Sequence, residues 1–406
     1  MKKHLLILGG GILNIAAINE AKMAGFIVYV ADADPNAPGF NVADVIIHAN
    51  ITSAEAVYDA IKNYPINGIV SMAEAGVLTG ALLNEKLKLE GIDSQTAKMA
   101  TSKALMRQQW KDNGFSLEFQ VVTNYEEAMV AADELNYFPL ILKPDKTYGG
   151  SRGVSKVNDK TELLEAFEFA QSNGMNELVV IEHCTEAEEY SCEVLVTDST
   201  AHLLCIGQKI KSPLPYRVDC SVQYPAKINE AERDKVKEMV QLATQQLGIK
   251  NGVAHIEFAL TANGPRLFEL GARCGGGHTP LIAKHVSGVN EFIEYANIAC
   301  GIKPTIDPLK KMKGADYRFI IFEPGEIEAI EVSDEIKKHK GIYDLVVQVK
   351  AGDRLKELRT TSQRCGAVIT FGDHLEEAAK LADWACNNIH VSYKGGKKSK
   401  ALIYTN

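Results

Sequence analysis

Two glutamates occupy apolar runs where a carboxylate is costly to bury. Glu257 lies in VAHIEFAL and Glu269 in PRLFEL, and the short turn TANG separates the two runs. The pattern predicts a β-hairpin with the two carboxylates facing each other. Like charges in that arrangement need a cation between them, and oxygen ligands of this kind suit Mg²⁺ (or Mn²⁺), which also bridges nucleotide phosphates.

Arg273 follows Glu269 by four residues, and three glycines follow Cys274. A guanidinium offers a planar pair of donors to a carboxylate or phosphate oxygen, and glycines let backbone N–H groups approach an anion. The segment therefore predicts an anion site. The structural alternative is a buried Glu–Arg ion pair beside a glycine turn.

Histidines near this segment are candidates for substrate contacts. His255 lies two residues before Glu257, hence on the same strand face, and is the preferred one. His278 and His285 are further candidates, although a histidine among apolar residues more often packs than reacts. No general base is evident.

A second cationic region begins at Lys143, which directly follows the apolar run LIL. Six residues later comes a loop whose backbone and side-chain donors can cover phosphates. It is not a Walker loop, and the alternative is a mobile hairpin turn. The loop consists of Gly149, Gly150, Ser151, Arg152 and Gly153.

Three further charged residues, before and after Lys143 in the chain, are candidates for nucleotide contacts. The buried run LVVIE ends at Glu182, and EYSCEVLV contains Glu189, which can accept hydrogen bonds from ribose hydroxyls. Lys103 opens a predicted helix capped by Ser102 or Thr101 and ended by Gly114. A separate set is interpreted as a basic-aromatic loop that grips an amino acid or is simply solvated: Lys209, Lys211, Tyr216 and Arg217.

The first hundred residues alternate short β runs with amphipathic helices, which predicts a parallel sheet covered by helices. The glycines after the first run fit a dinucleotide motif at Gly9 and Gly11 but fail at Asn14. Asp32 lies about where a ribose-binding acid would follow the second strand. The dinucleotide reading is therefore disfavoured against a tight strand-to-helix turn.

Composition narrows the class of protein. The chain has 406 residues, room for two or three domains, and a formal charge of -8, which disfavours nucleic-acid partners. Eight scattered cysteines without a CxxC pair indicate a reduced, cytoplasmic protein. The N-terminal apolar run is broken by glycines, so neither a signal peptide nor a membrane span is expected.

The ordered set of motifs resembles the ATP-grasp superfamily, and its amino-acid ligase (carboxylate–amine ligase) branch in particular. The motifs are Lys103, LILKP with its glycine loop, VVIEHC, EYSCEV, HIEF, FELGARCGGG and RCGAVITFGDHLEEA. The resemblance covers nearly the whole chain and implies an α/β (α+β overall) ATP-grasp fold. Its expected parts are a Rossmann-like pre-grasp domain (1–100), a nucleotide-binding domain (101–303) and a C-terminal α+β lobe (304–406).

The resemblance also implies roles. Lys103 and Lys143 would bind ATP phosphates beneath the glycine loop. Glu182, with the backbone of His183 and Cys184, would edge the adenine, while Glu189 would hold the ribose. Glu257 and Glu269 would carry Mg²⁺, and Arg273 would stabilise an acyl phosphate. The implied substrates are a small carboxylate and an amine, with amino acids favoured.

One departure concerns the metal: many family members have asparagine where this chain has Gly271, which leaves the number of metals open. The alternatives are an ATP-dependent carboxylase, a purine-pathway ligase, or a non-catalytic nucleotide-binding module. The sequence leaves the individual substrates undefined. It also leaves open whether the protein is a homodimer.

Overall fold

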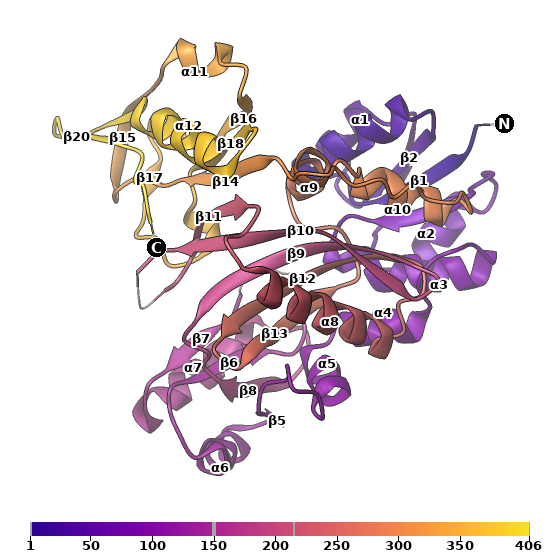
Figure 1. Ribbon diagram of the computed structural model, residues 1–406, viewed down its shortest axis with the longest axis horizontal. Helices are drawn as coiled ribbons and strands as arrows, with labels where there is room; N and C mark the ends of the chain where they lie inside the picture. Colours follow the sequence, from indigo (N-terminus) through magenta and orange to yellow (C-terminus); the bar gives the residue numbers. More distant parts are fainter. Residues whose placement is uncertain (1, 148–151, 214–215, 406) are drawn as a thin grey trace.

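The computed structural model describes residues 2–147, 152–213 and 216–405 (Figure 1). The N-terminal part is a parallel four-stranded sheet in the order β3-β2-β1-β4. This agrees with the predicted Rossmann-like domain. Its strands are β1 (His4–Leu8), β2 (Ile27–Asp32), β3 (Val45–His48) and β4 (Gly68–Ser71). Its helical segments are η1 (Ile12–Asn14), α1 (Ile15–Met23), η2 (Pro38–Asn41), α2 (Ala54–Ile61), η3 (Glu74–Gly76), α3 (Val77–Leu87) and α4 (Ser94–Ala100).

The glycine turn after β1 is held by its own chain. Asp32 Oδ2 accepts a hydrogen bond from the N–H of Gly10 at 2.7 Å, and Asn14 Nδ2 donates to the Gly9 carbonyl at 2.9 Å. The acid that would bind a ribose is thus already engaged by the turn. This geometry supports the tight strand-to-helix turn over a dinucleotide site.

A small antiparallel sheet, β5-β8-β6-β7, follows α5 (Lys103–Trp110) and carries two helices. Its strands are β5 (Phe119–Val122), β6 (Leu140–Pro144), β7 (Ser155–Val157) and β8 (Val179–His183), and its helical segments are α6 (Tyr125–Leu135), η4 (Lys160–Glu162) and α7 (Leu163–Asn173). α5 begins after Ser102, whose side chain accepts from the N–H of Leu105, as predicted for a capping residue. It ends at the fully buried Trp110, before the expected stop at Gly114.

An eight-stranded sheet spans the centre of the molecule in the order β13-β12-β9-β10-β11-β14-β18-β16 (Figure 1). Its strands are β9 (Glu188–Thr197), β10 (Thr200–Lys211), β11 (Asp219–Tyr224), β12 (Gly252–Thr261), β13 (Gly264–Gly271), β14 (Gly314–Ile320), β16 (Ile342–Val347) and β18 (Gly366–Gly372). Its helices are α8 (Glu230–Gln246), α9 (Thr279–Ser287) and α10 (Glu291–Ala299). Strands on both sides of the predicted boundary at residue 303 share this sheet, so the C-terminal lobe is hydrogen-bonded to the central part of the chain. The proposed domain limits remain a prediction.

The C-terminal lobe adds a third antiparallel sheet, β17-β15-β19-β20. Its elements are β15 (Gly325–Val332), α11 (Asp334–Lys338), β17 (Arg354–Leu355), η5 (Thr361–Gln363), α12 (Leu375–Asn387), β19 (Ile389–Tyr393) and β20 (Lys398–Lys400). The C-terminal run ALIYT, whose apolar residues are typical of a last short strand, does not form one, because Ala401 and Leu402 donate to two different segments, at Ile389 and Ile321. The last ladder is formed by Lys398–Lys400 instead.

One further expectation needs correction. Lys209 and Lys211 do not lie in a loop, because β10 continues through both residues and pairs with β11. Among the described residues, no helix has the length and apolar character needed to cross a membrane. All eight cysteines are free, and all but Cys184 are buried.

Candidate active site

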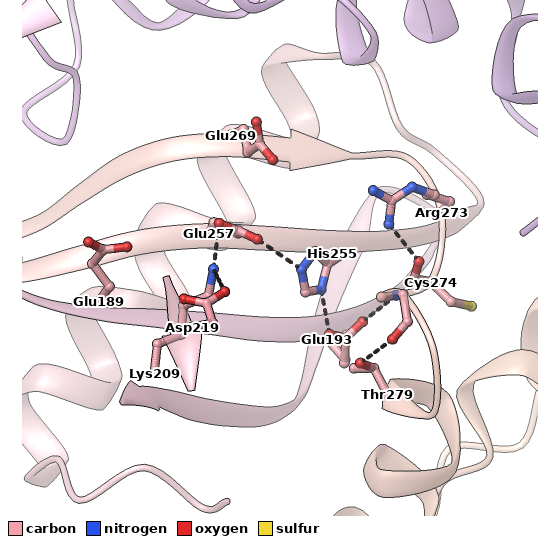
Figure 2. Close-up of polar contacts among 12 residues, drawn as sticks. Glu189, Glu193, Lys209, Asp219, His255, Glu257, Glu269, Arg273, Cys274 and Thr279 are labelled. Atoms are coloured by element: carbon pink, nitrogen blue, oxygen red, sulfur yellow. Dashed lines mark hydrogen bonds and ion pairs between the residues drawn. The ribbon is translucent and has the colours of Figure 1, made fainter. Parts of the chain in front are cut away.

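The predicted hairpin places its two glutamates directly opposite each other: Glu257 on β12 pairs with Glu269 on β13 (Figure 2). Each carboxylate has a lysine beside it. Lys209 Nζ on β10 lies 2.6 Å from Glu257 Oε2, and Lys103 Nζ at the start of α5 lies 3.3 Å from Glu269 Oε2. Two lysines from other elements thus offset the charge of the two acids.

The charges of Glu257 and Lys209 stabilise each other. Burial by itself raises the pKa of Glu257, but Lys209 and His255 hold it well below its usual value. Burial lowers the pKa of Lys209, yet Asp219 and Glu257 together raise it above the ordinary range. Glu257 is therefore a carboxylate and Lys209 a cation at neutral pH, which suits a site for phosphate and metal charge.

Lys143, predicted to bind phosphate, belongs to a buried ion cluster. Its Nζ lies 2.5 Å from Glu182 Oε1, while Arg107 Nε on α5 lies 2.8 Å from Glu182 Oε2. Arg107 also donates to the carbonyl of Phe268, next to Glu269, at 2.7 Å. The cluster therefore ties β6, β8 and α5 to the hairpin.

The cluster also changes the acidity of its lysine. Burial, the largest influence, and the nearby Arg107 together lower the pKa of Lys143 to about 8, although Glu182 opposes the shift. The carboxylate of Glu182 is kept charged by Arg107 and Lys143, which lower its pKa against the effect of burial. Its side chain is committed to these two cations.

The segment predicted to bind the edge of the adenine, Glu182–Cys184, lies at the end of β8. The N–H of His183 donates to Glu118 and the N–H of Cys184 donates to Pro139. These backbone donors would have to exchange partners to bind adenine. Glu189, predicted to hold a ribose, lies 2.5 Å from Lys211 Nζ and 3.3 Å from Arg217 Nη2.

Only part of the predicted phosphate loop can be described. Gly149, Gly150 and Ser151 lie outside the described residues. Arg152 is exposed, and Gly153 has a φ of 71°, which favours glycine. A Cβ at Gly153 would also approach Pro144 and Asn173 within 2.9–3.1 Å, so the turn just before β7 depends on glycine at this position.

Arg273 pairs with an acid from the N-terminal part of the chain. Its Nε lies 2.8 Å from Glu74 Oε2 in η3, and its Nη1 donates to the carbonyl of Cys274 at 2.9 Å. Glu74 follows β4 at the carboxyl end of the parallel sheet, where ligands of open α/β sheets bind. The ion pair thus joins the carboxyl end of the parallel N-terminal sheet to the glycine segment that follows Cys274.

His255 contacts Glu257, as the shared strand face predicted, with Nε2 3.5 Å from Oε1. Its Nδ1 lies 2.6 Å from Glu193 Oε1 on β9 (Figure 2). Burial alone lowers the pKa of His255, but Glu193 and Glu257 raise it to about 9. At neutral pH His255 is therefore an imidazolium, not a base; it donates a hydrogen bond to Glu193 and forms an ion pair with Glu257.

The other two histidines differ. His278 Nε2 lies 2.8 Å from Asp344 Oδ2 on β16, which links the glycine segment to the C-terminal lobe. His285 stacks on Phe371 with ring centroids 3.9 Å apart, and burial lowers its pKa. We therefore interpret His285 as a packing residue, while His278 borders the site.

Gly271, where the family resemblance implied asparagine, lies beside the Arg273 ion pair. A Cβ there would meet Glu74 Oε2 and Arg273 Cζ, each at 3.5 Å. An added methyl group fits, but a longer amide would compete with the ion pair for space. Among the described residues, no group of three or more His, Cys, Asp or Glu side chains is arranged to hold a metal ion.

Four residues that contact the predicted site residues were not predicted from the sequence: Glu74, Arg107, Glu193 and Asp219. Glu74 had a usable signal, since it closely follows a predicted parallel strand. Arg107 was one of several cations on a helix. Asp219, which contacts both Lys209 and Lys211, follows a turn and resembles a solvated residue. Their roles depend on contacts between segments far apart in sequence.

Two family models match the chain. Residues 136–280 match the ATP-grasp domain, and residues 318–394 match the L-amino acid ligase C-terminal domain 2. The first match contains the hairpin, Lys143 and Glu182 but not Arg107, and the second covers most of the C-terminal lobe.

Curated relatives include an L-arginine-specific L-amino acid ligase of Bacillus subtilis, 24% identical over 315 residues and covering 75% of each chain. A formate-dependent phosphoribosylglycinamide formyltransferase of Prochlorococcus marinus (strain MIT 9515) is 26% identical and covers 96% of this chain and 98% of that protein. The crystal structure of an L-amino acid ligase from Bacillus licheniformis superposes with a TM-score of 0.82 at 23% identity, covering 97% and 99% of the two chains. The structural match shows a shared fold.

Proposed function

We propose that this chain, an ATP-grasp protein with an L-amino acid ligase C-terminal domain, is an ATP-dependent carboxylate–amine ligase. The observation that carries the proposal is the Glu257–Glu269 pair with Lys209 and Lys103 beside it. Paired carboxylates ringed by cations suit the transfer of a phosphoryl group. The C-terminal domain match favours amino acids as substrates.

The proposed residue roles are those that the family resemblance implies. Lys103 and Lys143 bind ATP phosphates, covered by the loop Gly149–Gly153. The segment Glu182–Cys184 borders the adenine, with Glu182 acting through its ion cluster, and Glu189 faces the ribose. Glu257 and Glu269 offer hard oxygen ligands that fit Mg²⁺, which would neutralise phosphate charge when bound.

The proposed reaction has two steps. A substrate carboxylate oxygen attacks the γ-phosphoryl group, and the bond to ADP breaks, leaving an acyl phosphate. The amine then attacks the acyl carbon, phosphate leaves, and an amide forms. In both steps the chain mainly positions reactants, and Arg273 stabilises charge on the acyl phosphate.

A second candidate is a formate-dependent ligase of the purine type. Its support is coverage: the formyltransferase relative matches nearly the full length of both chains. A carboxylase stays a further alternative. The candidates differ in what ATP turnover requires: an amino acid pair, formate with a phosphorylated ribose amine, or bicarbonate.

The test is phosphate release from MgATP against amino acids supplied singly and in pairs, with parallel reactions containing bicarbonate or formate with glycinamide ribonucleotide. Glu269→Ala is the control for site-dependent turnover. Release that needs two amino acids and is lost in the variant supports the proposal. Release that needs bicarbonate or formate contradicts it in favour of the alternatives, and ATP binding without release indicates a binding module.

Nucleotide affinity should fall as pH rises through about 8, because Lys143 then loses the charge that attracts phosphate. Bound phosphate favours the charged lysine, so the apparent midpoint lies somewhat higher in the complex. Calorimetric titration with ATP from about pH 7 to about pH 10 measures the effect. In Lys143→Arg, whose charge persists, the affinity should stay flat, and an equal fall in both proteins would contradict the assignment.

A further inference from the structure

Glu193 is a charge-bearing side chain at the centre of the eight-stranded sheet that none of the roles above uses. It lies on β9, is 0% exposed, and is the strand partner of His255 on β12. A carboxylate removed from water in this way is costly unless it is fully hydrogen-bonded. Its position therefore calls for specific partners.

Both oxygens of Glu193 have donors from different segments. Oε1 lies 2.6 Å from His255 Nδ1, and Oε2 accepts from the backbone N–H of Gly275 at 3.0 Å (Figure 2). One carboxylate thus joins β12, which carries Glu257, to the glycine segment that follows Arg273. These contacts connect the two sides of the proposed site.

Gly275 is shaped for this contact. A Cβ there would lie 2.8 Å from Glu193 Oε1, 2.9 Å from His255 Nδ1 and 2.6 Å from Thr279 Cγ2. A larger residue would therefore separate the segment from the carboxylate. Cys274, between Gly275 and Arg273, accepts from the Arg273 guanidinium, so the position of the segment affects that of Arg273.

We propose that Glu193 is a positioning residue that locks His255 and the segment Arg273–Gly275 into one unit, so that Glu257 and Arg273 stay aligned during catalysis. The inference rests on the proposed function. Glu193 touches neither nucleotide nor substrate in this scheme. It acts through His255, which orients Glu257, and through the N–H of Gly275.

Glu193→Gln tests the proposal. The amide keeps the volume but has one acceptor for two donors, so one contact must be lost. We expect kcat to fall about 10–100-fold, as for other residues that orient ligands of a reactive centre, while KM for ATP changes less than about threefold. The KM is preserved because Lys103 and Lys143 lie on other elements.

Glu188→Gln is the matched control, because it makes the same change on the same strand. Glu188 is exposed at the start of β9, and its Oε2 accepts a hydrogen bond from the Tyr190 hydroxyl at 2.7 Å. The amide leaves the contacts of Glu193 with His255 and Gly275 in place, so kcat should stay within about threefold of the wild type.

Amide hydrogen exchange provides a readout that needs no substrate. In Glu193→Gln, peptides covering 273–278 should exchange about tenfold faster, while those of the β5–β8 sheet stay unchanged. Gly275→Ala keeps both charges and pushes the segment away from Glu193, so it should show the same kinetic split. It serves as the second variant if Glu193→Gln does not fold.

The outcomes distinguish the positioning role of Glu193 from the proposed ligase function. Faster exchange with an unchanged kcat would overturn the positioning role, and unchanged exchange would overturn the contact itself. A loss of kcat matched by an equal rise in KM for ATP would indicate a general structural defect and also contradict the proposal. If the wild type turns over no carboxylate–amine pair, the proposed function fails, and exchange still decides whether Glu193 holds the segment.

Discussion

Arg273→Ala is expected to lower turnover about 10²–10³-fold while the melting temperature changes little, because in the proposed reaction the guanidinium stabilises charge that develops on the acyl phosphate. Among the described residues, its guanidinium forms the Glu74 ion pair and one bond to Cys274, and both side chains of the pair retain some exposure. Single-turnover phosphate release and thermal denaturation measure the two effects separately.

The control is Arg266→Ala, which removes an arginine from β13, seven residues before Arg273. Its Nη1 donates to the carbonyls of Gly114 and Pro265. Turnover in this variant should stay within about threefold of the wild type. Parallel losses of melting temperature and turnover in Arg273→Ala would favour the purely structural ion pair. That pair would join Glu74 and Arg273, not Glu269 and Arg273.

Glu182→Gln is expected to lower the free energy of unfolding by about 3–5 kcal/mol at neutral pH. The variant leaves Arg107 and Lys143 buried without their shared carboxylate, and unpaired buried charges are strongly destabilising. Equilibrium urea denaturation measures the loss. Glu118→Gln, which alters an exposed acid near His183, should cost no more than about 1 kcal/mol.

The pH dependence of the Glu182→Gln effect has a definite sign. The pKa of Lys143 in the folded protein is lowered to about 8, below its unfolded value, so its charge opposes folding and is lost as pH rises. Glu182 raises the pKa of Lys143, so without it the lysine loses its proton at a still lower pH. The difference between Glu182→Gln and wild type should therefore shrink as pH rises toward about 8 and stay level above it. A difference that is constant below that pH would contradict the lysine assignment.

Local patterns were sufficient for the elements that hold the site. Alternating apolar residues and the turn TANG predicted the β12–β13 hairpin and the opposition of Glu257 and Glu269, and both are confirmed. Ser102 begins a helix as its side chain predicted. These features depend on hydrogen bonds within a few residues, which the local sequence controls.

Local patterns failed where a strand is completed by a distant partner. Lys209 and Lys211 looked like loop residues beside prolines, yet β10 runs through them because β9 and β11 pair on its two sides. The run ALIYT looked like a strand, yet its amides bond to two different segments. Propensity is outweighed in both cases by tertiary pairing.

By itself the sequence determined an order of motifs that resembles the ATP-grasp superfamily, the β12–β13 hairpin, and the set of cations and acids available for chemistry. The tertiary structure decided which charges meet: Lys209 with Glu257, Arg107 with Glu182, Glu74 with Arg273, and Glu193 with both His255 and Gly275. The reason is physical, since the energy of a buried charge depends on the partners that folding brings to it, and these partners come from segments far apart in the chain.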